Sequence, residues 1–200
     1  MRCIPTRPTR PTRPTWPTWL VITLSMVWGA LTLNLGSSEA GTVRAMNLEQ
    51  MTDRADMIFT GRVVGKRAEW NTERTRIYTY VTFEIETYLK GGSDARVATV
   101  RLLGGQVGRY LAHLPGTPQF GIGEDVLLFC AGDQARIPSV LGLSLGKFTI
   151  TSNADGERIL KRDISTLMLA NYSTKSRRPG DPVRRYRLSE VASRIAEYQQ

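Results

Sequence analysis

Residues 77–90 read Ile77-Tyr-Thr-Tyr-Val-Thr-Phe-Glu-Ile-Glu-Thr-Tyr-Leu-Lys90. One alternating set of positions is apolar or threonine: Ile77, Thr79, Val81, Phe83, Ile85, Thr87 and Leu89. The other set is more polar: Tyr78, Tyr80, Thr82, Glu84, Glu86, Tyr88 and Lys90. Because successive side chains of a strand point to opposite faces, this pattern predicts one long strand with a buried face and a solvated face. Strands of this length are typical of closed, coiled barrels.

Shorter apolar stretches on both sides of this segment predict further strands. We expect them at 57–67, with Gly61 and Gly65 marking bends, and at 97–103, 126–130, 140–150 and 157–161. Within 140–150 the apolar positions change parity, and we expect a bulge at Gly146 to return them to one face. These stretches give about six strands at hairpin spacing, and therefore a mainly β chain built as a small antiparallel barrel.

A short helix is predicted on each side of these strands. Asn47 stands three residues before Gln50, which is capping-box spacing, and it introduces a helix over residues 47–55. We expect Ser189 to cap a second, amphipathic helix over residues 188–200. Its narrow apolar stripe consists of Leu188, Val191, Ile195 and Tyr198.

Residues 1–40 have the pattern of an export signal. An uncharged apolar run covers residues 19–35, and the small residues Ser38 and Ala40 follow it. The basic residues before the run are Arg2, Arg7, Arg10 and Arg13. We therefore expect residues 1–40 to be a signal peptide cleaved after Ala40, and the protein to be exported to the periplasm or the extracellular space. The alternative is an uncleaved membrane anchor, because the run is at the lower length limit for a membrane span.

Charge and composition narrow the classes of function. The chain of 200 residues has a net charge of +9, which by itself favours a nucleic-acid binder. Residues 1–40 hold four arginines and one glutamate, so residues 41–200 keep 23 basic and 17 acidic residues, a net charge of +6. The segment 173–187 alone contributes +5 of this charge, which leaves the predicted barrel nearly neutral. We therefore expect no nucleic-acid partner.

The chain has few residues suited to metal binding or nucleophilic catalysis. It has two cysteines and one histidine, which excludes a disulfide-rich scaffold and a cluster of histidine ligands. Gly104–Gly108 resembles a phosphate-binding loop, but no helix is predicted after it. Glu84 and Glu86 share a strand face, as a pair of acid–base carboxylates would. The leading interpretation has no catalytic residue, metal or cofactor.

The most irregular segment, residues 104–123, is the first candidate for partner binding. Long loops on rigid β scaffolds often carry function, and exposed tyrosines are common at interfaces. The alternative is a packed lid over the end of the barrel. The residues expected to contact a partner are Tyr78, Tyr80, Arg109, Tyr110, His113 and Phe120.

A second candidate is the basic segment 173–187, which contains two prolines and is predicted to be a solvated linker. Such a segment can bind anionic polymer or lipid at a cell envelope. The residues expected to contact the anionic surface are Lys175, Arg177, Arg178, Arg184, Arg185 and Arg187.

Three motifs in residues 55–129 are Ala55-Asp-Met-Ile-Phe-Thr-Gly-Arg-Val-Val64, Tyr80-Val-Thr-Phe-Glu-Ile-Glu-Thr-Tyr-Leu-Lys-Gly91 and Phe120-Gly-Ile-Gly-Glu-Asp-Val-Leu-Leu-Phe129. Together they resemble the netrin-like modules, the group that includes the tissue inhibitors of metalloproteinases. The resemblance implies an OB-type five-stranded barrel. The chain is also similar to uncharacterised exported bacterial proteins that share Gly104-Gly-Gln-Val-Gly108 and Leu145-Gly-Lys-Phe148.

One departure from that family limits what the resemblance implies. The metalloproteinase inhibitors of this group use a cysteine at the mature N-terminus as a metal ligand, and they contain disulfides throughout. This chain is expected to start near Gly41 and has no cysteine there. The resemblance therefore implies the fold and not the zinc-chelating mechanism.

The predicted organisation is a signal peptide (1–40), a β-barrel domain (41–172), a basic linker (173–187) and a C-terminal helix (188–200). The leading hypothesis for function is an exported, non-enzymatic binding module for a protein partner, with a secreted protease as one partner class. One alternative is an envelope-associated protein that binds anionic polymer or lipid through the linker. Another is a hydrolase that uses Glu84 and Glu86. Membrane contact is expected only if the N-terminal segment is not cleaved.

We expect N-terminal sequencing of the exported protein to begin at Gly41, because the small residues before it fit the cleavage site of a signal peptide. An intact Met1 on the exported chain would contradict cleavage and support the anchor.

Overall fold

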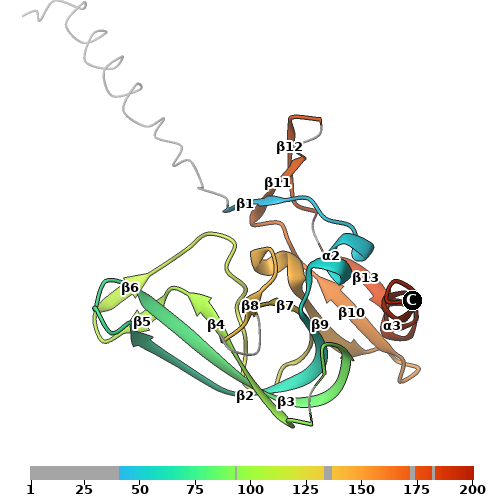
Figure 1. The fold of residues 1–200 in the computed structure, drawn as a ribbon, viewed down its shortest axis with the longest axis horizontal. Coiled ribbons are helices and arrows are strands. Elements are labelled where there is room, and N and C mark those ends of the chain that lie inside the picture. Colours follow the sequence, from blue (N-terminus) through green and yellow to red (C-terminus); the bar gives the residue numbers. More distant parts are fainter. Residues whose placement is uncertain (1–40, 93, 133–136, 172–173, 182) are drawn as a thin grey trace, which may run out of the picture. The chain divides into compact units, whose positions relative to one another are not determined.

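The computed structural model describes residues 41–92, 94–132, 137–171, 174–181 and 183–200. The predicted signal peptide and the choice between cleavage and anchor lie outside these residues. The described part is mainly β, as the alternating patterns predict, with a short helix near each end (Figure 1). The sequence-based prediction of a mainly β chain is therefore confirmed.

In chain order the described elements are β1 (Gly41–Arg44), α2 (Leu48–Arg54), β2 (Met57–Trp70), β3 (Ile77–Lys90), β4 (Val97–Leu103), β5 (Gly105–Val107), β6 (Tyr110–Ala112), β7 (Asp125–Ala131), β8 (Ser139–Val140), the 3-10 helix η1 (Leu143–Gly146), β9 (Lys147–Ser152), β10 (Arg158–Arg162), β11 (Leu167–Asn171), β12 (Ser176–Pro179), β13 (Arg184–Arg187) and α3 (Leu188–Glu197).

The largest sheet has the order β13-β10-β9-β7-β2-β3-β4, and its neighbouring strands are antiparallel. The short strand β8 adds to β7. A separate sheet joins β1, β11 and β12, with β1 parallel to β11. Among the described residues, the strand pairings do not form a closed ring. One backbone hydrogen bond, from Arg101 N to Pro138 O at 2.8 Å, links β4 to the residue before β8.

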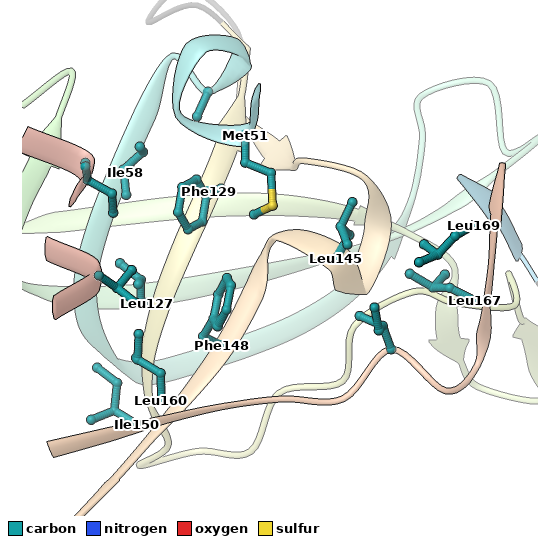
Figure 2. Close-up of a cluster of buried hydrophobic side chains, with 14 residues drawn as sticks. Met51, Ile58, Leu127, Phe129, Leu145, Phe148, Ile150, Leu160, Leu167 and Leu169 are labelled. Carbon is teal, nitrogen blue, oxygen red and sulfur yellow. The ribbon is translucent and has the colours of Figure 1, made fainter. Parts of the chain in front are cut away.

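Strand β7 separates two hydrophobic cores. Leu127 and Phe129 point into the first core, whereas Val126, Leu128 and Cys130 point into the second. The first core is covered by α2, α3 and β9 to β11, and the second by β3, β4 and the loop before β7. Figure 2 shows the first core, where Met51 of α2 and Phe148 of β9 lie beside Phe129. Both faces of β7 are buried, which explains why its sequence is apolar without alternation.

Strand β2 bends where it leaves β7. It pairs with β7 only from Met57 to Arg62, but it pairs with β3 as far as Trp70. Gly61 lies in this bend against the backbone of β3, and a Cβ on it would stand 2.6 Å from the carbonyl oxygen of Glu84. The register shifts around Gly61 show the irregularity that a glycine inside a strand predicts.

The long strand β3 follows the predicted alternation over its first half. Ile77, Val81 and Phe83 are buried, but Thr87, expected on the same face, is exposed. Tyr88, expected on the solvated face, packs edge-on against Phe59 with ring centroids 6.2 Å apart. The pairing shift between β2 and β3 at Ile58/Phe59 lies beside this reversal.

The two helices form where the sequence predicts them, with one difference in capping. Asn47 accepts a hydrogen bond from Gln50 N at 2.8 Å, and the Gln50 side chain accepts one from Asn47 N at 3.2 Å, which completes the capping box. The C-terminal helix begins at Leu188, and its N-cap residue is Arg187 rather than the expected Ser189. The strand β13 runs directly into this helix and leaves no turn in which Ser189 could cap it.

Residues 140–150 are not the single bulged strand that their apolar spacing predicts. The short strand β8 ends at Val140, η1 follows, and β9 begins at Lys147. Gly142 and Leu143 have φ values of 63° and 59°, which turn the chain between the two strands. A Cβ on Gly146 would stand 2.5 Å from the carbonyl oxygen of Leu141, so this glycine allows a close turn rather than a bulge.

The basic segment 173–187, expected to be a linker, contains two strands. Strand β12 pairs with β11, and β13 pairs with β10. Backbone pairing accounts for this difference, because an edge strand can form from any sequence whose backbone reaches a partner, including one rich in arginine.

We expect Gly61→Ala to lower the free energy of unfolding by about 1–3 kcal/mol, because the added methyl group meets a backbone oxygen that cannot move aside. The matched control is Gly65→Ala in the same strand, whose Cβ would make only an ordinary contact of 3.5 Å with Thr82. That variant should change stability by less than about 0.5 kcal/mol. Equal effects of the two variants in urea denaturation would contradict this account of the bend.

Candidate functional site

The β5–β6 hairpin lies at the end of the long β2–β3 pair (Figure 1). Gly104 N donates a hydrogen bond to the carbonyl oxygen of Ile77 at 2.9 Å, and the Thr79 hydroxyl donates one to the carbonyl oxygen of Gly104 at 2.8 Å. Gly105 has a φ of 136°, and a Cβ on it would stand 2.3 Å from the Thr79 hydroxyl oxygen. The Gly104-Gly105 pair therefore lets the hairpin lie directly against β3.

The outer surface of this hairpin is apolar and exposed. Leu111 is 72% exposed, Tyr110 50% and Leu103, just before the hairpin, 40%. The Tyr110 ring meets Trp70 edge-on at 5.5 Å. The Arg109 guanidinium lies 5.2 Å from the centre of the Tyr110 ring and donates a hydrogen bond to its hydroxyl at 3.2 Å. These contacts hold an aromatic and a cationic group together at the tip.

Two hollows lie beside the hairpin, one of about 460 Å³ and one of about 390 Å³. His113 and Leu114 line both hollows. Lys66 and Arg67 line the larger hollow, and Arg76 lines the smaller one. No acidic residue is among the described residues that line either hollow. We call β5, β6 and these two hollows the hairpin site.

A buried ion pair anchors the far end of the loop that contains the hairpin. Lys147 Nζ lies 2.7 Å from a carboxylate oxygen of Glu124, and both side chains are largely buried. The same carboxylate accepts hydrogen bonds from the Thr149 hydroxyl at 2.6 Å and from Gly121 N at 3.0 Å. Lys147 also donates to the carbonyl oxygen of Gln119. We call this group the Glu124 clamp.

The clamp determines the charge state of its carboxyl group. Burial raises the pKa of Glu124, but the hydrogen bonds from Lys147, Thr149 and Gly121 N outweigh burial and hold that pKa below its ordinary value. Glu124 is therefore ionised at neutral pH and keeps the loop joined to β9.

The six residues predicted to bind a partner are brought together only in part. Arg109, Tyr110 and His113 belong to the hairpin site. Tyr78 and Tyr80 lie on the opposite face of β3 from Thr79, which lines the larger hollow. Their rings stack with Arg101 at 4.9 Å and with Arg67 at 5.1 Å.

Phe120, the sixth of these residues, is a core residue. It is buried, its ring meets Phe83 at 5.4 Å, and Lys147 lies 4.6 Å from its ring centre. The sequence places Phe120 and Tyr110 in the same loop and does not distinguish their environments. Phe120 lines the larger hollow of the hairpin site together with His113, but its burial leaves it little surface for a partner and makes it an anchor of the loop.

The six residues predicted to bind an anionic surface lie on two different sheets. Lys175, Arg177 and Arg178 are on or next to β12, whereas Arg184, Arg185 and Arg187 are on β13. Some of this charge is neutralised locally, since Arg184 pairs with Asp181 at 2.9 Å and Arg187 with Glu157 at 3.1 Å. Arg178 lies 3.7 Å from the same aspartate.

The two glutamates of the hydrolase alternative lie beside a hollow of about 870 Å³. Glu86 accepts two hydrogen bonds from Arg158, at 2.6 and 2.7 Å, and one from the Thr60 hydroxyl at 3.2 Å. The Arg158 hydrogen bond lowers the pKa of Glu86, which keeps it ionised and unsuited to act as a general acid. Glu84 lies opposite Arg62, but that arginine pairs with Asp125 at 2.7 Å.

Other chemistry suggested by residue types finds no support in the geometry. Burial raises the pKa of the Cys130 thiol to about 12, so it is not a thiolate nucleophile at neutral pH. Within the described ranges, no group of three or more His, Cys, Asp or Glu residues could hold a metal ion. A separate finding concerns membranes: among the described residues, neither α2 nor α3 has the length and apolar character of a membrane-spanning helix.

Sequence reasoning missed the Glu124 clamp and the Glu86–Arg158 pair. In both, the partners are more than twenty residues apart in the chain, so no local spacing indicates them. The only signal in the sequence was the position of Glu124 directly before an apolar strand.

No protein-family model matches the sequence, and no curated protein matches it at a significant level.

We expect Glu124→Gln to lower the free energy of unfolding at pH 7 by about 1–3 kcal/mol, because it leaves the mostly buried Lys147 without its carboxylate. The folded-state pKa is depressed, so this stabilisation is present above the unfolded pKa of about 4.3 and is lost as pH falls through the folded pKa. Denaturation curves of the two proteins should therefore converge in acid. The control Glu84→Gln, at an exposed site, should match the stability of the wild type at pH 7 and in acid. A stability difference between wild type and Glu124→Gln that persisted in acid would count against the clamp.

Proposed function

We propose that this chain is an exported, non-enzymatic binding module that holds a protein partner at the hairpin site. The observation that carries the proposal is the exposure of Leu111 and Tyr110 on a hairpin whose loop is held at its start by Thr79 and at its far end by the Glu124 clamp. A rigid apolar tip loses little conformational entropy on binding, and buried aromatic anchors dominate protein interfaces. Exposed apolar groups on a fixed scaffold mark an interaction surface.

The charges around the site define the chemistry of the partner. Lys66, Arg67 and Arg76 line the hollows, and Arg109 lies at the tip. Arg67 makes one exposed contact with Glu69 at 3.6 Å, which neutralises little of this charge. The site therefore suits a partner segment that carries both acidic and apolar side chains.

The proposal includes a specific type of β fold. We infer an OB-type barrel around Phe83, in which the curved β2–β3–β4 hairpins approach β8 and β7. The hydrogen bond from Arg101 N to Pro138 O supports this barrel, because it joins the two ends of that curve.

A secreted protease is the partner class that the resemblance to netrin-like modules suggests. Binding would not use zinc chelation at the expected mature N-terminus, since Gly41 is not a cysteine.

One observation favours the alternative of binding to an anionic envelope surface. Lys161 and Arg185 stand directly opposite each other on β10 and β13. Neither forms an ion pair with another residue that the structure describes. Like charges in this position are unfavourable unless an anion lies between them or solvent screens them.

We expect a photoreactive phenylalanine derivative in place of Leu111 to form a covalent adduct with a protein in the exporting host, because this side chain is the most exposed large apolar group of the hairpin. The same group in place of Val97, which is 55% exposed on β4, is the matched control and should give little adduct. Arg76→Glu should reduce the adduct at position 111, since it reverses a charge that lines the site.

Equal adduct yields at positions 97 and 111 would contradict binding at the hairpin site. Retention of the protein on anionic envelope material, lost at high salt and without an adduct at position 111, would instead favour the basic strands.

A further inference from the structure

A small hollow of about 230 Å³ lies beside the first core, and none of its lining residues belongs to the hairpin site. Leu48 at the start of α2, Phe148 on β9, Tyr186 on β13 and Val191 on α3 form its apolar lining. Arg162 at the end of β10 is the cation that lines it among these apolar groups.

Arg162 is largely buried and poorly paired. Its Nε has no hydrogen-bond partner in the described structure, and its Nη1 has only a weak contact with the Met51 sulfur at 3.9 Å. Its guanidinium lies 5.1 Å from the ring centre of Phe148 and 5.9 Å from that of Tyr186. The Tyr186 side chain is a hydrogen-bond partner of the guanidinium, but it leaves Nε unpaired. A buried N–H group without a partner is unfavourable, and an anion beside it would relieve the cost.

The charges nearby do not supply that anion. Burial lowers the pKa of the Arg162 guanidinium, and Asp181 is the carboxylate that acts on it from a distance. Asp181 is already paired with Arg184 at 2.9 Å and lies 3.7 Å from Arg178. Arg184 also stands directly opposite Arg162 in the pairing of β10 with β13. The carboxylate nearest in charge effect to Arg162 is therefore already engaged by two other arginines.

The opening of the hollow does not oppose an anion. Glu190 and Arg194 lie at its exposed rim and neutralise each other in an ion pair of 2.9 Å. The lining as a whole therefore keeps one unbalanced positive charge, that of Arg162. Charge complementarity favours a monoanion.

Size and shape define the rest of the ligand. The hollow is smaller than the roughly 300–1,000 Å³ of sites for drug-sized molecules. It is larger than the cavity of about 150 Å³ that holds benzene in an engineered protein. The rings of Phe148 and Tyr186 meet at 6.2 Å and 71°, so each can present an edge or a face to a third ring.

We propose that this hollow binds a small aromatic monocarboxylate, with its carboxylate on Arg162 and its ring among Phe148, Tyr186 and Val191. This site is separate from the hairpin site and does not depend on the function proposed there. It would give the Arg162 Nε a hydrogen-bond partner and fill the hollow in one binding event.

The test is an NMR titration of the full chain with benzoate, benzamide and acetate. Benzoate should shift the amide signals of residues around 162, 186 and 191 in a saturable way. Benzamide has the same shape without the charge and should bind at least about tenfold more weakly, the effect of losing a hydrogen bond between charged groups. Acetate lacks the ring and should give no saturable shift.

Arg162→Met keeps the length and apolar stem of the side chain and should abolish benzoate binding, whereas Arg194→Met at the rim should retain it. If Arg162→Met does not fold, the comparison of benzoate with benzamide on the wild type still decides the matter. The proposal is overturned if benzoate does not bind, if benzamide binds as well, if the shifts lie elsewhere, or if folded Arg162→Met still binds.

Discussion

The burial of both faces of strand β7 is the constraint on which the rest of the structure depends. Antiparallel sheets commonly leave one face in water, but here alternate residues of Val126–Cys130 enter two separate cores. Each core needs its own cover, so the helices and β10 pack on one side, and β3 and β4 curve over the other. This strand is stable only with both faces buried, because exposure of either face would place large apolar side chains in water.

The bend in β2 follows from that constraint. Its first residues serve both cores, Ile58 the first and Phe59 the second, and it pairs with β7 only up to Arg62. Beyond Arg62 its strand partner is β3 alone, and the β5–β6 hairpin lies at the far end of this pair. The exposed apolar tip is therefore a consequence of the long β2–β3 pair, which extends beyond the part of β2 that pairs with β7.

Two ion pairs at the edges of the hydrophobic cores join different elements of the fold. The Glu124 clamp joins the loop to β9, and the Glu86–Arg158 pair joins β3 to β10. The clamp is largely buried, so it contributes through the penalty for breaking it more than through net attraction, whereas the more exposed Glu86–Arg158 pair is screened by solvent. Arg162 departs from this arrangement, since Asp181 is already paired with Arg184 and lies close to Arg178, and that departure is why its hollow is a candidate for a ligand.

By itself the sequence determined the features that depend on neighbours along the chain: the alternation of Ile77–Phe83, the capping box of Asn47 and Gln50, and the apolar strand before Cys130. Only the tertiary structure decided that Phe120 is buried while Tyr110 is exposed, that residues 140–150 turn through a 3-10 helix, and that Arg162 lacks a carboxylate partner. Local patterns report which face of an element is apolar because that depends on backbone geometry alone. Which surface covers that face, and which charge meets which, depends on contacts between residues far apart in the chain, and no local spacing encodes them.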